Sequence, residues 1–227
     1  MPKLAQATVR AAVSQASHLV PKLALVAGGK SFGGRMTSQA QAALPLSGVR
    51  ALVFLGFPLH SAGRPSDERA NHLFNVSIPM LFLQGTRDAL ADTQTLQKLL
   101  ERLGTRATLK LFRDVDHSFH VPVRTGRTDA EVRAEMLDTL ASWLQSVICI
   151  RAARQRLWKM RVEGKRPTMH DLESIGGVLY NAEWRVHEMA GIQKELQPAP
   201  PFYSDEWPEE LVKVLGLSTM RDTGLRH

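Results

Sequence analysis

Residues 23–36 read L-A-L-V-A-G-G-K-S-F-G-G-R-M, and they constrain the fold more than any other stretch. Residues 23–26 form an apolar run, which is typical of a parallel strand covered on both faces. A sharp turn at Ser31 needs small neighbours, so that a strand and a helix can approach closely. The residues that would supply this room are Gly28, Gly29, Gly33 and Gly34. We therefore expect a buried strand, a strained turn at Ser31 and the start of a helix.

Residues 29–33 fit the pattern G-x-S-x-G, which is typical of a nucleophile elbow. The helix that follows such a turn brings free N–H groups and the positive end of its dipole beside the hydroxyl. The same glycine-rich turn could instead close an ordinary strand–helix unit or hold a phosphate. Other residues must therefore decide whether Ser31 is a nucleophile.

Strand-like and helix-like segments alternate along the chain. Strands are predicted at residues 23–26, 49–57, 78–83 and 107–112, and helices at 1–20, 35–43, 66–74, 91–103 and 128–147. Such alternation predicts an α/β fold with a mostly parallel sheet of about four strands and helices on both faces.

Three polar residues follow predicted strands, in the order Ser31, Asp88 and His117. Function in open α/β sheets lies at the carboxyl ends of the strands, and this order is that of α/β-hydrolases. Each residue also has a simpler interpretation: Asp88 could cap the next helix, and His117 could bond Asp114 or Asp116. Their joint occurrence favours a Ser-His-Asp triad.

Three motifs resemble one known group of proteins: residues 29–36 (G-K-S-F-G-G-R-M), 85–90 (G-T-R-D-A-L) and 116–120 (D-H-S-F-H). The chain resembles predicted α/β-hydrolases related to dienelactone hydrolase, in the testis-expressed hydrolase-like subgroup, over about residues 5–147. The resemblance implies Ser31 as nucleophile, His117 as base and Asp88 as the residue that orients His117, but it does not supply the natural substrate. A triad of this kind predicts hydrolytic acyl transfer, so we expect hydrolysis of an ester or similar acyl bond in a small molecule, without a cofactor or metal.

Other site residues follow from this reaction. The backbone N–H of Phe32, just after the nucleophile, is expected to be an oxyanion donor. Phe57, Leu59 and His60 follow the second predicted strand, and we expect them to line the substrate pocket or to pack within their loop.

The chain departs from the α/β-hydrolase pattern before the elbow, where about four strands and a second oxyanion-donor loop normally precede it. Only one predicted helix stands there, over residues 1–20. We therefore expect an N-terminally truncated domain with at most weak esterase activity. The strand at 23–26 would lose a neighbour, and its exposed edge predicts self-association or a partner chain.

The 227 residues predict two parts: a hydrolase-like domain over residues 1–148 and a helical extension over residues 149–227. One cysteine excludes an internal disulfide framework and favours a reducing, cytoplasmic location. No apolar stretch approaches the ~20 residues that span a bilayer.

The formal net charge of +7 is unevenly spread. Residues 151–166 hold seven basic side chains and one acidic one, whereas residues 167–227 hold five and ten. Nucleic-acid binding is not expected, because no groove-reading or base-stacking motif accompanies the charge.

Apolar residues at heptad-like spacing in 168–196 suggest that residues 151–196 bind a partner or pack back on the sheet. His170, His187 and the acids of this tail lack metal-ligand spacing. Two alternatives to an enzyme are a non-catalytic interaction module and an inactive fragment.

Overall fold

A computed structural model describes residues 2–21 and 23–164 of the chain, without the side chains of residues 148–158 and 161. The chain divides into two units, and the first contains residues 1–143 and every predicted site residue. The predicted helix at 168–196, with His170 and His187, lies outside the described residues.

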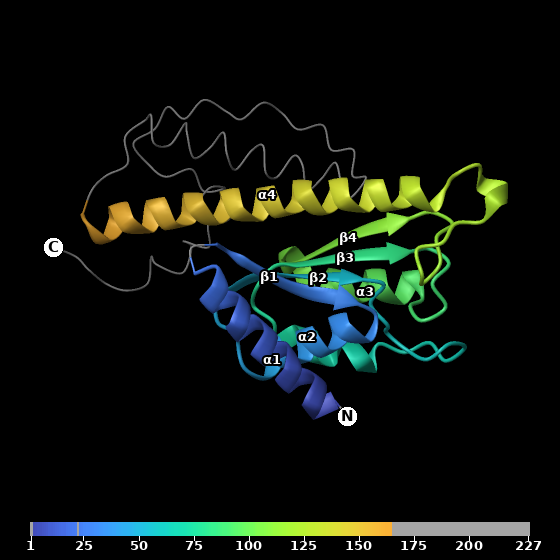
Figure 1. The fold of residues 1–227 in the computed structure, drawn as a ribbon, viewed down its shortest axis with the longest axis horizontal. Helices are drawn as coiled ribbons and strands as arrows, with labels where there is room; N and C mark the ends of the chain where they lie inside the picture. Colours follow the sequence, from blue (N-terminus) through green and yellow to red (C-terminus); the bar gives the residue numbers. More distant parts are fainter. Residues whose placement is uncertain (1, 22, 165–227) are drawn as a thin grey trace. The chain divides into compact units, whose positions relative to one another are not determined.

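Four parallel strands form one sheet in the order in which they occur in the chain (Figure 1). The strands are β1 (Leu25–Lys30), β2 (Val49–Leu55), β3 (Met80–Gly85) and β4 (Ala107–Phe112). The prediction of an α/β fold with a parallel sheet of about four strands is therefore confirmed.

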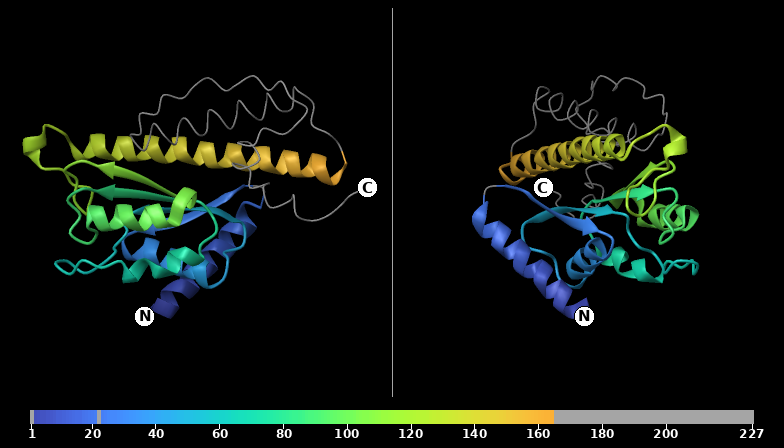
Figure 2. Two further views of the ribbon diagram at one scale, coloured as in Figure 1. Left: turned by 180° about the vertical axis from the view of Figure 1, so that it is seen from behind. Right: turned by 45° about the vertical axis from the view of Figure 1, so that its right-hand side comes forward.

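One face of the sheet carries the main hydrophobic core. The elements that cover this face are α1 (Pro2–Leu19), α2 (Phe32–Ala43), the 3₁₀ helix η1 (Glu68–Asn75) and α3 (Thr93–Leu103). Met80 and Phe82 of β3 reach into this core and are fully buried. Figure 2 shows the same layer from two further directions.

The other face is covered by the first part of α4 (Asp129–Val162). Leu81 and Leu83 alternate with the core residues of β3 and are also buried. The indole N–H of Trp143, in α4, donates to the hydroxyl of Thr108, on β4, over 3.1 Å. Two short 3₁₀ turns, η2 (Gly104–Arg106) and η3 (Val123–Thr125), complete the described elements.

The helix ends follow the local sequence closely. Thr128 and Glu131 form a capping box at the start of α4, in which the Thr128 N–H donates to the Glu131 carboxylate over 2.7 Å. Gly104 ends α3 with a φ of 63°. The short helix expected at residues 66–74 is the 3₁₀ helix η1, which begins two residues later. Asp67 stands at its N-cap position without a side-chain cap hydrogen bond, and the Ser66 hydroxyl accepts the Glu68 N–H.

The expectation of a strand at 23–26 buried on both faces was wrong. β1 begins at Leu25 and runs to Lys30, and its side chains alternate between half-buried and exposed. Leu23 is 67% exposed and Val26 is 38% exposed. The physical reason is position: β1 is an edge strand of the described sheet, and only one of its faces meets the core.

α4 continues without a break through residue 148, so the proposed domain boundary there stays a prediction. Within residues 2–21 and 23–164, no helix combines the length and the apolar character needed to cross a membrane. The cytoplasmic location stays a prediction.

Candidate active site

Ser31 lies at the turn between β1 and α2 in a backbone conformation that non-glycine residues rarely adopt. Its φ is 53° and its ψ is −122°. Its N–H donates to the Leu55 carbonyl over 3.0 Å, which ties the turn to the neighbouring strand. The strained turn predicted from the G-x-S-x-G pattern is therefore present.

Close backbone contacts explain most of the glycines around this turn. A Cβ on Gly28 would lie 2.0 Å from the Val53 carbonyl oxygen, and one on Gly34 would lie 2.6 Å from the Gly29 oxygen. The expectation was wrong for Gly33, where a Cβ would meet nothing within 4 Å. β1 and α2 approach each other at Gly29 and Gly34, and Gly28 faces the neighbouring strand β2, so Gly33 is not needed for these contacts.

Ser31, His117 and Asp88 are joined by hydrogen bonds in series. His117 Nε2 lies 2.8 Å from the Ser31 Oγ, and His117 Nδ1 lies 2.7 Å from the Asp88 Oδ2. The three residues follow β1, β4 and β3 respectively, at the edge where the strands end. The simpler interpretation of His117, a bond to Asp114 or Asp116, does not describe its hydrogen bonds.

The hydrogen bond to the buried Asp88 carboxylate selects the tautomer of the His117 ring. The Asp88 side chain is fully buried, whereas that of His117 is 24% exposed. A carboxylate only accepts hydrogen bonds, so in the neutral ring Nδ1 carries the proton and Nε2 presents its lone pair to the Ser31 hydroxyl. The arrangement can therefore remove a proton from Ser31.

Gln84, which the sequence reasoning missed, holds Asp88 in place. The fully buried Gln84 accepts the Phe57 N–H over 2.8 Å and donates through its amide nitrogen to Asp88 Oδ2. The Leu90 N–H donates to the other Asp88 oxygen over 2.8 Å. A glutamine inside the apolar run of β3, four residues before an aspartate, was the signal in the sequence.

Gly56 is a second residue that the sequence reasoning missed. Its φ is 65°, and a Cβ there would lie 3.3 Å from the His117 ring and 3.5 Å from Asp88 Oδ2. A glycine directly after β2 thus leaves the space that the imidazole occupies. The signal in the sequence was a glycine at the end of an apolar strand, before Pro58.

The loop that carries His117 is held by its own aspartates. Asp116 Oδ1 accepts the N–H groups of Ser118 and His120 over 2.8 and 2.9 Å. His120 Nδ1 lies 2.9 Å from Asp129 Oδ2, at the start of α4. This contact raises the pKa of His120 and lowers that of Asp129. The loop therefore presents His117 from a backbone fastened on both sides.

Phe32 is the first residue of α2, where backbone N–H groups have no partner within the helix. Phe32 itself is 48% exposed. Its N–H belongs to the first turn of α2, directly after Ser31, which is the position that the oxyanion prediction names. Its role as an oxyanion donor stays a prediction.

The predicted pocket residues Phe57, Leu59 and His60 are all buried. Phe57 and Leu59 have no exposed surface and belong to the main core. His60 accepts the Asp92 N–H through Nε2 over 3.0 Å and contacts the Ser61 carbonyl through Nδ1. These contacts match the loop-packing interpretation, and a substrate-binding role for the three residues stays a prediction.

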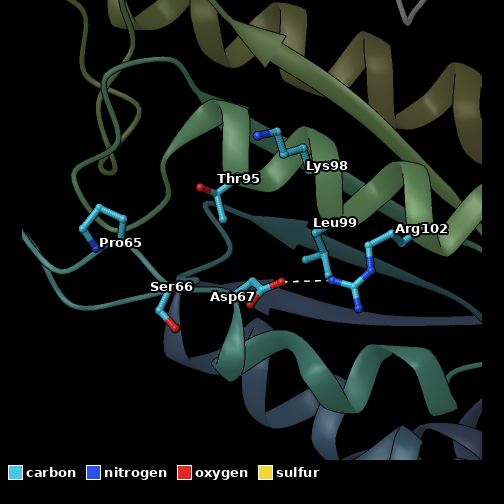
Figure 3. A pocket seen from close by; sticks show the side chains of 7 residues that line it. All are labelled: Pro65, Ser66, Asp67, Thr95, Lys98, Leu99 and Arg102. Carbon is cyan, nitrogen blue, oxygen red and sulfur yellow. Dashed lines mark hydrogen bonds and ion pairs between the residues drawn. The ribbon is translucent and has the colours of Figure 1, made fainter.

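A surface cavity of about 400 Å³ lies between the loop before η1 and α3 (Figure 3). An ion pair of 3.1 Å between Asp67 and Arg102 crosses it. The lining residues are Pro65, Ser66, Asp67, Thr95, Lys98, Leu99 and Arg102. Ser31, His117 and Asp88 are not among them, so this cavity is separate from the candidate active site.

Within the described part of the chain, no three His, Cys, Asp or Glu side chains are grouped closely enough to hold a metal ion. The hydrogen-bonded arrangement at Ser31 provides a nucleophile and a base from protein side chains alone. The expectation of a reaction without metal or cofactor stays a prediction.

Comparison with known proteins places the chain. The family model described as an alpha/beta hydrolase domain matches residues 1–145 of the 227. The chain belongs to the α/β-hydrolase family. The same family accounts for the strand–turn–helix at Ser31 and for the order of Ser31, Asp88 and His117.

A solved structure is also similar to this α/β-hydrolase: a Xanthomonas campestris protein described as a member of a/b serine hydrolase without lid. The two are 28% identical with a TM-score of 0.41, and the match covers 57% of this chain and 52% of the other. This α/β-hydrolase thus spans about half the length of that protein. The family match supports a hydrolase function; the dienelactone-hydrolase-like subgroup and the N-terminal truncation stay predictions.

Proposed function

We propose that this α/β-hydrolase is a serine hydrolase that cleaves ester or similar acyl bonds of small molecules. Ser31 is the nucleophile, His117 the general base, and Asp88 the residue that orients His117. One observation carries the proposal: His117 bridges Ser31 Oγ at 2.8 Å and Asp88 Oδ2 at 2.7 Å. Both distances lie within the reach of about 2.6–3.2 Å that an activated nucleophile needs.

In the first half of the reaction the Ser31 oxygen attacks the ester carbonyl while its proton passes to His117 Nε2. The imidazolium that forms is stabilised by the Asp88 carboxylate, which stays ionised. His117 then gives the proton to the departing alcohol oxygen, and the acyl group remains on Ser31. Gln84 and Leu90 keep Asp88 fixed through this step by hydrogen bonds to its two oxygens.

In the second half a water molecule attacks the acyl group while His117 Nε2 takes the water proton. The tetrahedral intermediate collapses, the carboxylic acid leaves, and the proton returns to the Ser31 oxygen. The net reaction consumes one water and yields an acid and an alcohol.

The negative charge that develops on the carbonyl oxygen needs donors. We assign the Phe32 N–H to this role, because it lies in the first turn of α2, directly after the nucleophile. Within the described residues we assign no second donor. Because loss of one such donor costs about 10²–10³ in turnover in comparable enzymes, weak esterase activity is expected.

The substrate class follows from the arrangement of Ser31, His117 and Asp88, which is suited to acyl transfer through a covalent intermediate on a serine. We therefore propose a small-molecule ester. Self-association or a partner chain at the edge of β1 stays a prediction.

The test is hydrolysis of p-nitrophenyl butyrate by the full chain and by Ser31→Ala. We expect slow but saturable release of p-nitrophenol by the wild type, falling to the uncatalysed rate in the variant. Thermal unfolding of both proteins controls for folding. A rate that Ser31→Ala leaves unchanged would remove the proposed nucleophile.

A further inference from the structure

Arg35 has a buried polar atom that no protein group satisfies. Among the buried side-chain nitrogen and oxygen atoms of the described residues, only Arg35 Nε lacks a hydrogen-bond partner. A buried donor without an acceptor costs about 1–3 kcal/mol, and more for a charged group. Such a group calls for a structural or functional reason.

The packing of α2 on η1 brings a second arginine beside Arg35. Both helices start at the edge where the strands end, and both run away from it. Ser38 contacts His72, and these residues follow Arg35 and Arg69 by three positions each. Arg35 and Arg69 therefore occupy equivalent positions on the two facing helices. The Ser38 Oγ lies 2.7 Å from His72 Nε2, and Arg69 is held by a 2.7 Å hydrogen bond to the Ser61 hydroxyl.

The two guanidinium groups repel each other and lack an anion. Burial, and then the charge of Arg69, lower the pKa of Arg35. Burial, and then the charge of Arg35, lower the pKa of His72 to about 4, so His72 is neutral at pH 7. Among the described residues no carboxylate forms an ion pair with either arginine, and Asp67, just before η1, pairs with Arg102 instead.

Arg35 lies one helical turn after the proposed nucleophile. The Arg35 N–H donates to the Ser31 carbonyl over 3.2 Å in the first turn of α2. The Arg35 guanidinium carbon lies 5.7 Å from the centre of the Phe32 ring, and Phe32 directly follows Ser31. The Arg35 guanidinium therefore lies beside the residue that follows the proposed nucleophile.

We propose that Arg35 and Arg69 form a subsite that binds the carboxylate of an acidic substrate, so that the ester cleaved at Ser31 belongs to a molecule with a second, free acid group. This inference rests on the proposed function. A carboxylate accepts hydrogen bonds from guanidinium groups in a planar, two-point geometry, and its charge offsets their repulsion. Neutral esters of the same length gain none of this.

The experiment compares two esters of equal chain length: mono-p-nitrophenyl adipate, with a free carboxylate, and p-nitrophenyl hexanoate, which is neutral. kcat/KM is measured for the full-length wild type and for Arg35→Gln, Arg35→Lys, Arg69→Gln and Arg133→Gln. Arg133 is exposed on α4, so its replacement removes the same charge outside the subsite. Thermal unfolding checks that each variant folds.

We expect the wild type to prefer the adipate ester. Because charged hydrogen bonds contribute about ten- to hundredfold, Arg35→Gln and Arg69→Gln should each reduce this preference by about tenfold or more. Arg35→Lys keeps the charge and should retain part of it, and Arg133→Gln should change it less than about twofold. Hydrolysis of both esters with no preference in the wild type overturns the subsite and leaves the hydrolase intact.

A binding measurement separates this inference from the proposed reaction. Calorimetry with Ser31→Ala, which has no nucleophile, measures the affinity for monomethyl adipate with and without Arg35→Gln. Binding weakened about tenfold by Arg35→Gln supports the subsite even if neither p-nitrophenyl ester is hydrolysed, a result that would overturn only the hydrolase. Binding that both Arg35→Gln and Arg69→Gln leave unchanged overturns the subsite.

Discussion

Two side-chain groups lie near Ser31, and they differ in how completely the protein satisfies them. In the first group every polar side chain has a partner: Ser31 and Asp88 bond His117, and Gln84 holds Asp88. In the second group Arg35 and Arg69 carry like charges, and Arg35 Nε has no partner.

The difference teaches what each group is built for. A fully bonded group is held in one geometry before any ligand arrives, which suits proton transfer. A partly buried cation without an anion is left in a costly state that a negatively charged ligand relieves. Five substitutions test this contrast, from the largest expected effect to the smallest.

Replacement of the general base His117 in the first group should have the largest effect on kcat. Replacement of His117 by Gln removes the acceptor of the Ser31 proton, so kcat for p-nitrophenyl butyrate should fall to the rate of Ser31→Ala, by about 10⁴-fold in an active enzyme. His120→Gln, in the same loop, is the matched control and should retain most activity. Equal losses in the two variants would point to the loop rather than to His117.

Asp88→Asn should reduce kcat by about 10³-fold, because an amide no longer fixes the tautomer with the proton on Nδ1. Asp129→Asn is the control, since Asp129 forms a similar contact of 2.9 Å with His120 on the surface. Steady-state kinetics of both variants compares the two Asp–His pairs. Activity unchanged in Asp88→Asn would contradict the role given to Asp88.

Gln84→Leu tests whether the hydrogen bonds behind Asp88 matter for the reaction. It should lower kcat by about tenfold and destabilise the fold by about 1–3 kcal/mol, because the Phe57 N–H loses its acceptor. Gln41→Leu is the matched control for Gln84→Leu, because the buried Gln41 also accepts a backbone N–H, that of Leu46, over 2.8 Å, but far from His117. Denaturant unfolding should show similar losses, whereas only Gln84→Leu should lose activity.

Gly56→Ala sharpens the account of the space around His117. Alanine at a positive φ costs about 1 kcal/mol, and the added Cβ would lie 3.3 Å from the imidazole. Gly63→Ala is the control, because Gly63 has a φ of 72° and an added Cβ would meet nothing within 4 Å. This substitution therefore causes backbone strain without a steric clash. We expect similar losses of stability and a several-fold lower kcat only for Gly56→Ala.

His72→Gln examines the second group through the pH dependence of stability. The pKa of His72 is about 4 in the folded chain and 6.5 in its ordinary state. The unfolded chain therefore binds the extra proton first, and stability is lost as the pH falls from about 6.5 toward 4. The variant should show a smaller fall in melting temperature over this window, whereas His18→Gln, at an exposed residue, should match the wild type.

Local patterns in the sequence predicted much of the fold. The strand at 107–112, the end of the helix at 103 and the start of the helix near 128 each depend on residues close together in the chain, such as Gly104 and the Thr128–Glu131 capping box. The exposure of β1 could not be predicted in this way, because it depends on which strands and helices lie beside it. Its apolar run has the same pattern as that of a fully covered strand.

The candidate site divides in the same manner. Ser31, Asp88 and His117 carry signals in motif, order and position after strands. Gln84 and Gly56 carry weaker signals, since a glutamine or glycine in a strand gains meaning only from the atoms it meets. The pairing of Arg35 with Arg69 arises from the way α2 packs on η1, and no local pattern contains it.

Covalent labelling measures the activation of Ser31 by His117 most directly. The full chain and His117→Gln are treated with a fluorophosphonate, digested and analysed by mass spectrometry. We expect a phosphonate adduct on Ser31 in the wild type and none in His117→Gln at the same exposure. An unmodified Ser31 in the folded wild type, or equal labelling in the variant, would contradict a nucleophile activated by this histidine.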